Sequence, residues 1–232
     1  MYLENKQSNR LLSLDILRGI TIAGMIMVNN PGSWGHVYTP LGHASWHGLT
    51  PTDLVFPFFM FIMGISTFMS LRKFNFEPSR AALWKILRRT LLIFVIGLAL
   101  NWFGMLTGGL SRGESLGEAA THFDTLRILG VLQRLALAYG FAALIAVLVK
   151  NKYLPWVIAL LLIGYHLLLQ FGRGFELSEQ NIIGVIDRAL LGSNHMYKDW
   201  TPEGELIAFD PEGLLSTLPS IAHVLIGLLF GK

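Results

Sequence analysis

Three polar residues near the start of the chain are of types that suit general-base catalysis at a carbonyl group. Asn29 closes the first apolar run, His43 follows in a polar connection, and Asp53 opens the second apolar run. Histidine with a carboxylate partner is the usual general-base pair, and an asparagine amide can donate to an oxyanion. Because this connection joins the two runs, we expect the three side chains to converge. An ordinary helix cap is the alternative for Asp53.

Charged and amide side chains inside apolar runs form a second set of candidates. Asp15 and Arg18 are three residues apart in the first run, so they share one helix face as a structural ion pair or as an anion site. Gln133 and Arg134 lie in the fourth run, where a buried Arg beside an amide suits phosphate or another polar ligand. Along a helix, Arg134 would lie about 10 Å beyond Arg127. Helix-end carbonyls are the alternative partners for Arg134.

The elements that position these residues belong to a membrane protein. The 232 residues are 53% hydrophobic and 14% charged, whereas soluble domains carry about 25% charged residues. This composition excludes a disordered segment, a coiled coil, a DNA-binding module and a disulfide scaffold. The chain has no cysteine, so thiolate catalysis and cysteine metal sites are excluded. The net charge of +3 comes from basic residues between apolar runs, so it does not indicate a nucleic-acid partner.

Six apolar runs are long enough to cross a bilayer, which takes about 20 residues. Only helices and closed barrels satisfy the backbone in lipid, and these runs lack the two-residue alternation of barrel strands. We therefore predict an all-α polytopic membrane helix bundle of about six transmembrane helices, forming one domain. The predicted spans are Leu11–Asn30, Asp53–Leu71, about Ile86–Leu106, Leu126–Val149, Tyr153–Phe171 and Leu214–Phe230.

The positions of Lys and Arg predict the orientation of the bundle, because cytoplasmic loops carry the excess of positive charge. The segments predicted to be cytoplasmic are the N-terminal tail with Lys6 and Arg10, residues 72–89 and residues 150–152. The segments predicted to be outside are 31–52, 107–125 and 172–213. Loops as long as 31–52 and 172–213 are usually functional or disordered, and their aromatic residues argue against disorder.

Several common catalytic signatures are absent. There is no P-loop, G-x-G-x-x-G after a strand, G-x-S-x-G or H-E-x-x-H. The acyltransferase pattern His-x4-Asp also fails, because Asp53 is one residue too far from His47. His43 and His47 are four residues apart, but Gly48 and Pro51 argue against a helix there. We therefore expect no metal site.

Several sequence blocks occur together and in order along the chain. They are Leu14-Asp15-Ile-Leu-Arg18-Gly19, Met27-Val-Asn29, the run from His43 to Gly64, Gly130-Val-Leu-Gln133-Arg134-Leu, Ile186-Asp187-Arg188-Ala-Leu-Leu-Gly192, His195-Met-Tyr197 and Asp210-Pro-Glu212-Gly213. In residue types and order, these blocks resemble the heparan-α-glucosaminide N-acetyltransferase family, which belongs to a wider group of transmembrane acyltransferases with bacterial members.

The resemblance implies an acetyltransferase that uses cytosolic acetyl-CoA as co-substrate. The acceptor is the amino group of a glucosamine-type sugar on the lumenal side, which is the periplasmic side in a bacterium. His43 matches the active histidine of the family, and Asn29 and Asp53 match its asparagine and aspartate. His43 would either carry the acetyl group as an acyl-histidine or deprotonate the attacking ammonium in a direct transfer. Asp53 would orient the imidazole, and Asn29 would stabilise the oxyanion.

The same resemblance suggests binding roles for the other candidates. The residues expected along the coenzyme A tunnel are Asp15, Arg18, Gln133 and Arg134. The residues expected to contact the sugar are Trp46, Asp210 and Glu212, with a cap for the last helix as an equal alternative for the two acids. The expected partners are an amino-sugar or glycan acceptor and the lipid bilayer, with a homodimer left open. The expected location is the bacterial inner membrane.

The number of spans departs from the family pattern. The family has about eleven membrane spans and this chain about six, so 1–232 is expected to be the N-terminal part of a longer fold that could be inactive alone. A transporter or flippase for an amino sugar or its lipid-linked form is an alternative that needs no acetyl donor. In a non-catalytic scaffold, a third reading, His43, Asn29 and Asp53 would tolerate substitution.

Overall fold

A computed structural model describes residues 12–232, so Lys6, Arg10 and Leu11 lie outside the described residues. The chain divides into two compact units, Met1–Ile62 and Met63–Lys232, and the boundary falls inside helix α2 (Val55–Leu71). Within residues 12–232, five helices are long and apolar enough to cross a membrane, and a further apolar helix, α8 (Thr217–Phe230), has 14 residues. The predicted all-α polytopic membrane bundle is confirmed, with a shorter last helix than expected.

The first unit contains α1, the connection after it and the start of α2. Helix α1 (Leu12–Asn29) exposes large apolar side chains such as Ile16 and Ile20, as expected of a surface that faces lipid. The connection includes two single turns of 3-10 helix, η1 (Thr39–Leu41) and η2 (Thr52–Leu54), and η2 leads directly into α2.

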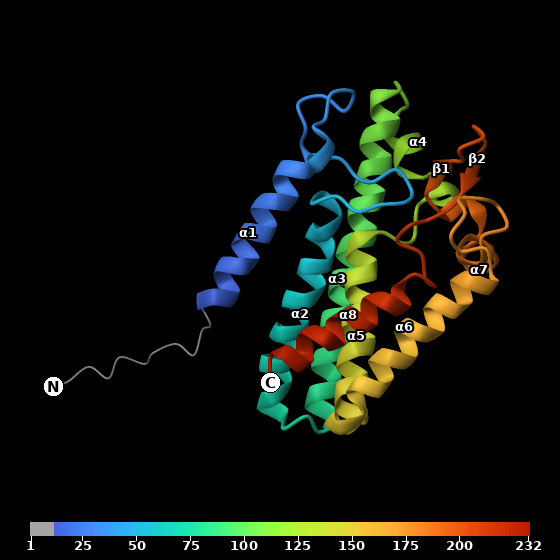
Figure 1. Cartoon of the computed structure of the whole chain (residues 1–232). Helices are drawn as coiled ribbons and strands as arrows, with labels where there is room; N and C mark the ends of the chain where they lie inside the picture. The colour runs from blue at the N-terminus through green and yellow to red at the C-terminus, as the bar shows by residue number, and fades with distance from the viewer. Residues whose placement is uncertain (1–11) are drawn as a thin grey trace. The chain divides into compact units, whose positions relative to one another are not determined.

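The second unit is built on four apolar helices that pack in the order α3, α5, α8, α6 (Figure 1). Their bounds are Arg80–Ser111 for α3, Val131–Leu148 for α5, Thr217–Phe230 for α8 and Leu154–Phe171 for α6. The later part of α2 also packs on α8, through Gly64. A Cβ atom at Gly64 would overlap the backbone of Val224 and lie 2.7 Å from the nitrogen of Leu228.

Small residues allow α5 to lie at the centre of this packing. The buried small residues of α5 are Ala136, Ala138, Gly140, Ala142, Ala143 and Ala146. A Cβ atom at Gly140 would lie 2.7 Å from the hydroxyl of Thr90 on α3, so the two backbones approach closely here. Small residues at helix interfaces are typical of membrane bundles, where apolar burial gives little driving force between helices.

Two helices differ from their predicted spans. Ser79 caps α3 by accepting from the amide of Ala82, so this helix begins at Arg80, earlier than expected. Helix α5 begins at Val131, five residues late, because the preceding residues bond to other segments. The Asn101 side chain donates to the carbonyl of Arg127, and the amide of Ile128 donates to the carbonyl of His195. The predicted helical spacing of Arg127 and Arg134 is therefore wrong.

The segment predicted as a long outer loop, 172–213, contains regular structure. Asn181 caps helix α7 (Ile182–Leu191) by accepting from the amide of Ile183. An antiparallel hairpin follows, in which β1 (Lys198–Trp200) pairs with β2 (Leu206–Ala208). The remaining short elements are α4 (Leu116–Ala120), η3 (Arg72–Phe74), η4 (Phe123–Thr125), η5 (Asn151–Tyr153) and η6 (Ser193–His195).

Candidate functional site

His43 and Asp53 form a short hydrogen bond in the connection between α1 and α2. The distance from His43 Nδ1 to Asp53 Oδ1 is 2.6 Å. The His43 side chain is 70% exposed and that of Asp53 is 21% exposed. An ionised carboxylate can only accept, so Nδ1 carries the shared proton and the lone pair of Nε2 is available. The pair thus presents an accessible basic nitrogen.

The second carboxylate oxygen of Asp53 is held by the loop itself. Oδ2 accepts from the backbone N–H groups of Ala44 and Thr50, at 3.2 and 2.8 Å, and lies 3.0 Å from the Thr50 hydroxyl. We call residues 42–53 the dyad loop. Its chain turns at Gly48, whose φ of 118° lies in the region that favours glycine. Asp53 therefore closes a ring of local contacts and is not a simple helix cap.

The other candidates of the first unit make more local contacts. The Asn29 amide donates to the carbonyl of Met25 at 2.9 Å, one helical turn back on α1, as Ser and Thr side chains often do. Asp15 and Arg18 form the predicted pair at 3.4 Å, and both side chains stay partly exposed. Trp46 meets the His47 ring edge-on, with ring centroids 6.4 Å apart.

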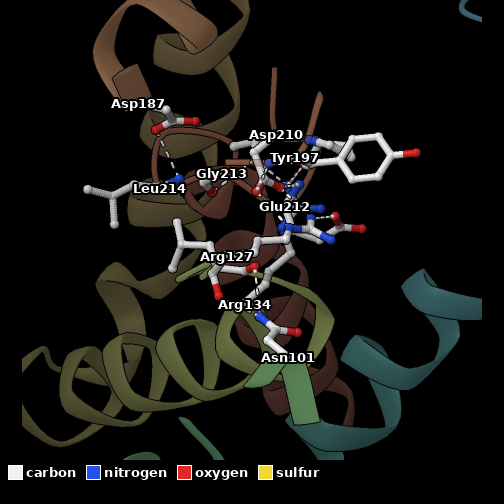
Figure 2. A network of polar contacts seen from close by, with 12 residues as sticks. Asn101, Arg127, Arg134, Asp187, Tyr197, Asp210, Glu212, Gly213 and Leu214 are labelled. Atoms are coloured by element: carbon white, nitrogen blue, oxygen red, sulfur yellow. Dashed lines mark hydrogen bonds and ion pairs between the residues drawn. The ribbon is translucent and has the colours of Figure 1, made fainter. Parts of the chain in front are cut away.

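A second cluster of charges lies in the second unit (Figure 2). Arg127 donates to both oxygens of Asp210, at 2.6 and 2.9 Å, and to Glu212 at 2.6 Å. The Asp210 side chain is 0% exposed. The Arg127 guanidinium also lies over the Tyr197 ring, 5.1 Å from its centroid. We call Arg127, Asp210, Glu212 and Tyr197 the Arg127 cluster.

Backbone amides satisfy the remaining hydrogen-bonding capacity of the buried Asp210 carboxylate. Its oxygens accept from the amides of Tyr197, at 3.2 Å, and Glu212, at 2.9 Å. Burial works against the charge of Arg127, but the hydrogen bond and charge of Asp210 outweigh it and raise the pKa of Arg127. The cluster thus joins the segment before α5 to the segment before α8 by an ion pair.

Arg134 and Asp187 hold the same segment from two further directions. The Arg134 guanidinium donates to the carbonyl of Pro211 and to the hydroxyl of Ser216. Asp187 Oδ1 accepts from the amides of Leu214, at 3.0 Å, and Leu215, at 3.2 Å (Figure 2). These four contacts fix the chain that leads into α8.

Among the described residues, the buried polar atoms without a hydrogen-bond partner include Nε2 of Gln133 and Oδ2 of Asp187. Asp187 Oδ2 lies against Gly213, where a Cβ atom would overlap it. Burial raises the pKa of Asp187, although the amides of Leu215 and Leu214 oppose the shift. Burial therefore makes the Asp187 carboxyl group easier to protonate than an aspartate in water.

The described part of the chain contains no group of side chains arranged to hold a metal ion. Nowhere in residues 12–232 do three His, Asp or Glu side chains gather closely enough to hold an ion.

This chain is similar to known proteins over most of its length. A family model described as heparan-alpha-glucosaminide N-acetyltransferase, catalytic, matches residues 10–190. The chain belongs to this family. The heparan-alpha-glucosaminide N-acetyltransferase of Homo sapiens is 32% identical over 269 residues, and that of Mus musculus is 30% identical over 271 residues.

The chain corresponds to only part of each of these relatives. The human match covers 96% of this chain but 38% of the human protein, and the mouse match covers 97% and 39%. The chain therefore spans less than two-fifths of the length of these relatives. The family model includes Asn29, His43 and Asp53, whereas Asp210 and Glu212 lie beyond its last matched residue.

The sequence patterns predicted no role for two residues of these clusters, Thr50 and Arg127. Thr50 contacts both Asp53 and the backbone before His43; a Thr three residues before an Asp is a local signal that could have indicated this contact. Arg127 pairs with an acid 83 residues away. No local pattern could have indicated that partner, because the ion pair depends on how α5 and α8 pack.

Proposed function

We propose that this chain is the histidine-bearing part of a transmembrane acetyltransferase. The donor is acetyl-CoA, and the acceptor is the amino group of a glucosamine-type sugar. The observation that carries the proposal is the 2.6 Å hydrogen bond from His43 to Asp53, which leaves Nε2 of an exposed imidazole free to act. The names of the human and mouse relatives support both the acetyl transfer and the glucosaminide acceptor.

The pair suits either of two acyl-transfer sequences. In the first, Nε2 attacks the thioester carbonyl, the C–S bond breaks, coenzyme A leaves as the thiol form after taking a proton, and the sugar amine then displaces the histidine. In the second, Nε2 removes one proton from the sugar ammonium, and the amine attacks the thioester carbonyl directly. The C–S bond then breaks, and the second proton lost by the nitrogen goes to the departing thiolate, so that coenzyme A leaves as the thiol. In both sequences Asp53 stabilises the imidazolium that forms.

The donor-side residues are Asp15, Arg18, Gln133 and Arg134 in this proposal. Arg18 is the best suited to a phosphate group, because its side chain is 41% exposed while Asp15 orients its guanidinium. The Gln133 amide is buried and its nitrogen has a donor to spare. Arg134 is bonded to Pro211 and Ser216, so we assign it a role through the segment that it holds.

The acceptor-side residues are Trp46, Asp210 and Glu212. Trp46 lies in the dyad loop, where an indole face could stack on a sugar ring. Glu212 is 22% exposed, and its carboxylate suits a sugar ammonium. Asp210 is buried, so its role would be to hold Arg127, which in turn contacts Glu212. Asn29 is proposed as the oxyanion donor, which requires its amide to exchange the Met25 carbonyl for the substrate.

We place the dyad loop on the periplasmic side of a bacterial inner membrane. The support is the charge distribution: residues 31–50 contain no Lys or Arg, while residues 72–89 contain six and a single acid, Glu77. Donor and acceptor would then approach from opposite sides of the bilayer.

The test is the release of free thiol from acetyl-CoA by the detergent-solubilised chain, with and without glucosamine. The chain is compared with His43→Ala and with His36→Ala, an exposed histidine of the same connection that contacts Ser33 and not Asp53. We expect glucosamine-dependent release that is lost in His43→Ala and kept in His36→Ala. Equal release from His43→Ala would overturn the proposal, and so would absence of release both from the folded chain and from a longer protein that contains it.

A further inference from the structure

Thr50 lies where the contacts of the dyad loop meet. Its backbone N–H donates to Asp53 Oδ2 at 2.8 Å, and its hydroxyl oxygen lies 3.0 Å from the same atom. The hydroxyl oxygen also lies 2.7 Å from the carbonyl oxygen of Gly42, the residue before His43. Thr50 therefore connects the backbone that carries the histidine to the carboxylate that partners it.

The Thr50 hydroxyl acts as a clamp, by which we mean that it holds two hydrogen-bond acceptors together. A threonine hydroxyl has one proton, whereas the Gly42 carbonyl and the ionised Asp53 carboxylate can only accept. The proton is therefore shared between two acceptors that belong to the first and last residues of the dyad loop. Removal of the hydroxyl leaves both acceptors without this donor and breaks the link between them.

The clamp matters because an aspartate carboxylate rotates easily about its last torsion, which has a broad, two-fold energy profile. Around Oδ2, the Ala44 and Thr50 amides and the Thr50 hydroxyl form a set of donors on one side of the carboxylate. They leave Oδ1 directed at His43 Nδ1. A small rotation of the carboxylate would lengthen the 2.6 Å bond that fixes the histidine tautomer.

We infer that Thr50 is the positioning residue of the His43–Asp53 pair. Its hydroxyl ties the Asp53 carboxylate to the Gly42 carbonyl and so holds Oδ1 against His43 Nδ1. The catalytic consequence of this inference rests on the proposed acetyl transfer, whereas its effect on the reactivity of His43 does not.

The chain offers a matched control two residues away. Thr52 is buried, and its hydroxyl donates to the carbonyl of Pro40 at 3.2 Å without contacting Asp53. The substitution Thr52→Val therefore removes one side chain–backbone hydrogen bond from the same connection and leaves the pair untouched. Thr50→Ser keeps the hydroxyl of Thr50 and removes only a methyl group.

The experiment measures two properties of the full chain and of these three variants. The first is steady-state acetyl transfer, with kcat and KM determined separately. The second is the carbethoxylation rate of His43 by diethylpyrocarbonate, divided by the rate of His36 in the same molecule and read by peptide mass spectrometry. The second readout needs no catalytic turnover, since the reagent reacts with the free imidazole nitrogen.

We expect Thr50→Val to lower kcat about tenfold with both KM values within about twofold, as for loss of a hydrogen bond to a charged group. The His43 to His36 ratio should fall at least about threefold in the same variant. Thr50→Ser and Thr52→Val should both stay within about twofold of the parent chain. Where Thr50→Val does not fold, as judged by its thermal midpoint, Thr50→Ala takes its place.

Three results would overturn the inference: a kcat and a ratio unchanged in Thr50→Val, equal losses in Thr50→Val and Thr50→Ser, or equal losses in Thr50→Val and Thr52→Val. If the chain does not transfer acetyl groups, the His43 to His36 carbethoxylation ratio alone tests the positioning role of Thr50. A ratio that depends on the Thr50 hydroxyl then supports the positioning role and rejects only the proposed function.

Discussion

The dyad loop and the Arg127 cluster both place an acid against a base, yet they are built in opposite ways. In the dyad loop the partners are ten residues apart, and the base is 70% exposed. In the Arg127 cluster the partners are 83 residues apart, and Asp210 is fully buried. The first pair is closed by local backbone groups, and the second joins segments that are distant in the sequence.

The difference predicts what each cluster can do. Exposed charges keep their hydration and gain little from pairing, so the dyad loop contributes little to stability but can meet a substrate. A buried pair is costly to break, because the remaining charge loses its partner away from water. The Arg127 cluster should therefore act mainly on the stability of the second unit, and the dyad loop mainly on acetyl transfer.

The largest effect on activity is expected from Asp53→Asn. The Ala44 and Thr50 amides require an acceptor at the Oδ2 position, so the amide oxygen of the asparagine must sit there. Its NH2 group then faces His43 Nδ1 and forces the proton onto Nε2, the wrong tautomer. We expect kcat to fall roughly 10³-fold. Thermal unfolding in detergent should shift by no more than about 2 °C.

The control for this substitution is Asp124→Asn, which changes an exposed carboxyl group elsewhere in the chain. It should leave kcat unchanged within about twofold. A large fall in the thermal midpoint of Asp53→Asn would contradict the comparison, because the dyad loop would then be a structural cluster as well.

The largest effect on stability is expected from Arg127→Met. The substitution leaves Asp210 buried without its base, and we expect a loss of about 3 kcal/mol or more of unfolding free energy. Asp210→Asn should cost less, since Arg127 keeps Glu212. The double variant should be more stable than Arg127→Met, because no lone buried charge remains. Chemical and thermal unfolding of the four chains measures this cycle, and additive losses would contradict it.

A smaller loss of stability is expected from Gly64→Ala. The added methyl group would overlap the backbone of Val224 on α8, so α2 and α8 must separate, at a cost of about 2 kcal/mol. Gly104→Ala on α3 is the matched control. Nothing lies within 4 Å of its added Cβ atom, so the gain in helix propensity should stabilise the chain by a few tenths of a kcal/mol or more. Thermal midpoints of the two variants should shift in opposite directions.

The sequence predicts the elements whose signals are local. Apolar runs of sufficient length predict the membrane helices, and a histidine and an aspartate joined by a short polar connection predict the contact between His43 and Asp53. The functional roles of these residues stay predictions.

The features that the sequence did not predict depend on which hydrogen-bond partner a side chain takes. The start of α5 is delayed because Asn101, 26 residues earlier, bonds to the carbonyl of Arg127. The expected approach of Asn29 to the pair is not among its contacts, since a carbonyl of its own helix is the nearer partner. Only the packed structure decides which of two available acceptors such a side chain takes.

The smallest effect is expected from Asp187→Asn. This substitution tests whether burial alone decides the charge state of the Asp187 carboxyl group in the second unit. Burial raises the pKa of Asp187 above the ordinary value of 3.8, so the folded chain binds this proton more tightly than the unfolded chain. The stabilisation is complete below the ordinary pKa and is lost as the pH rises through the folded pKa.

Asp187→Asn removes this dependence and keeps an oxygen that can accept from the Leu214 and Leu215 amides. Relative to the parent chain, its thermal midpoint should therefore rise by about 3 °C between pH 4, close to the ordinary pKa, and pH 8. Asp187→Ala, which loses the acceptor, should be less stable than the parent at both pH values. A difference between Asp187→Asn and the parent that stays constant with pH would show that Asp187 remains ionised despite its burial. The partial compensation by Arg134 would then be stronger than the cost of removing the carboxylate from water.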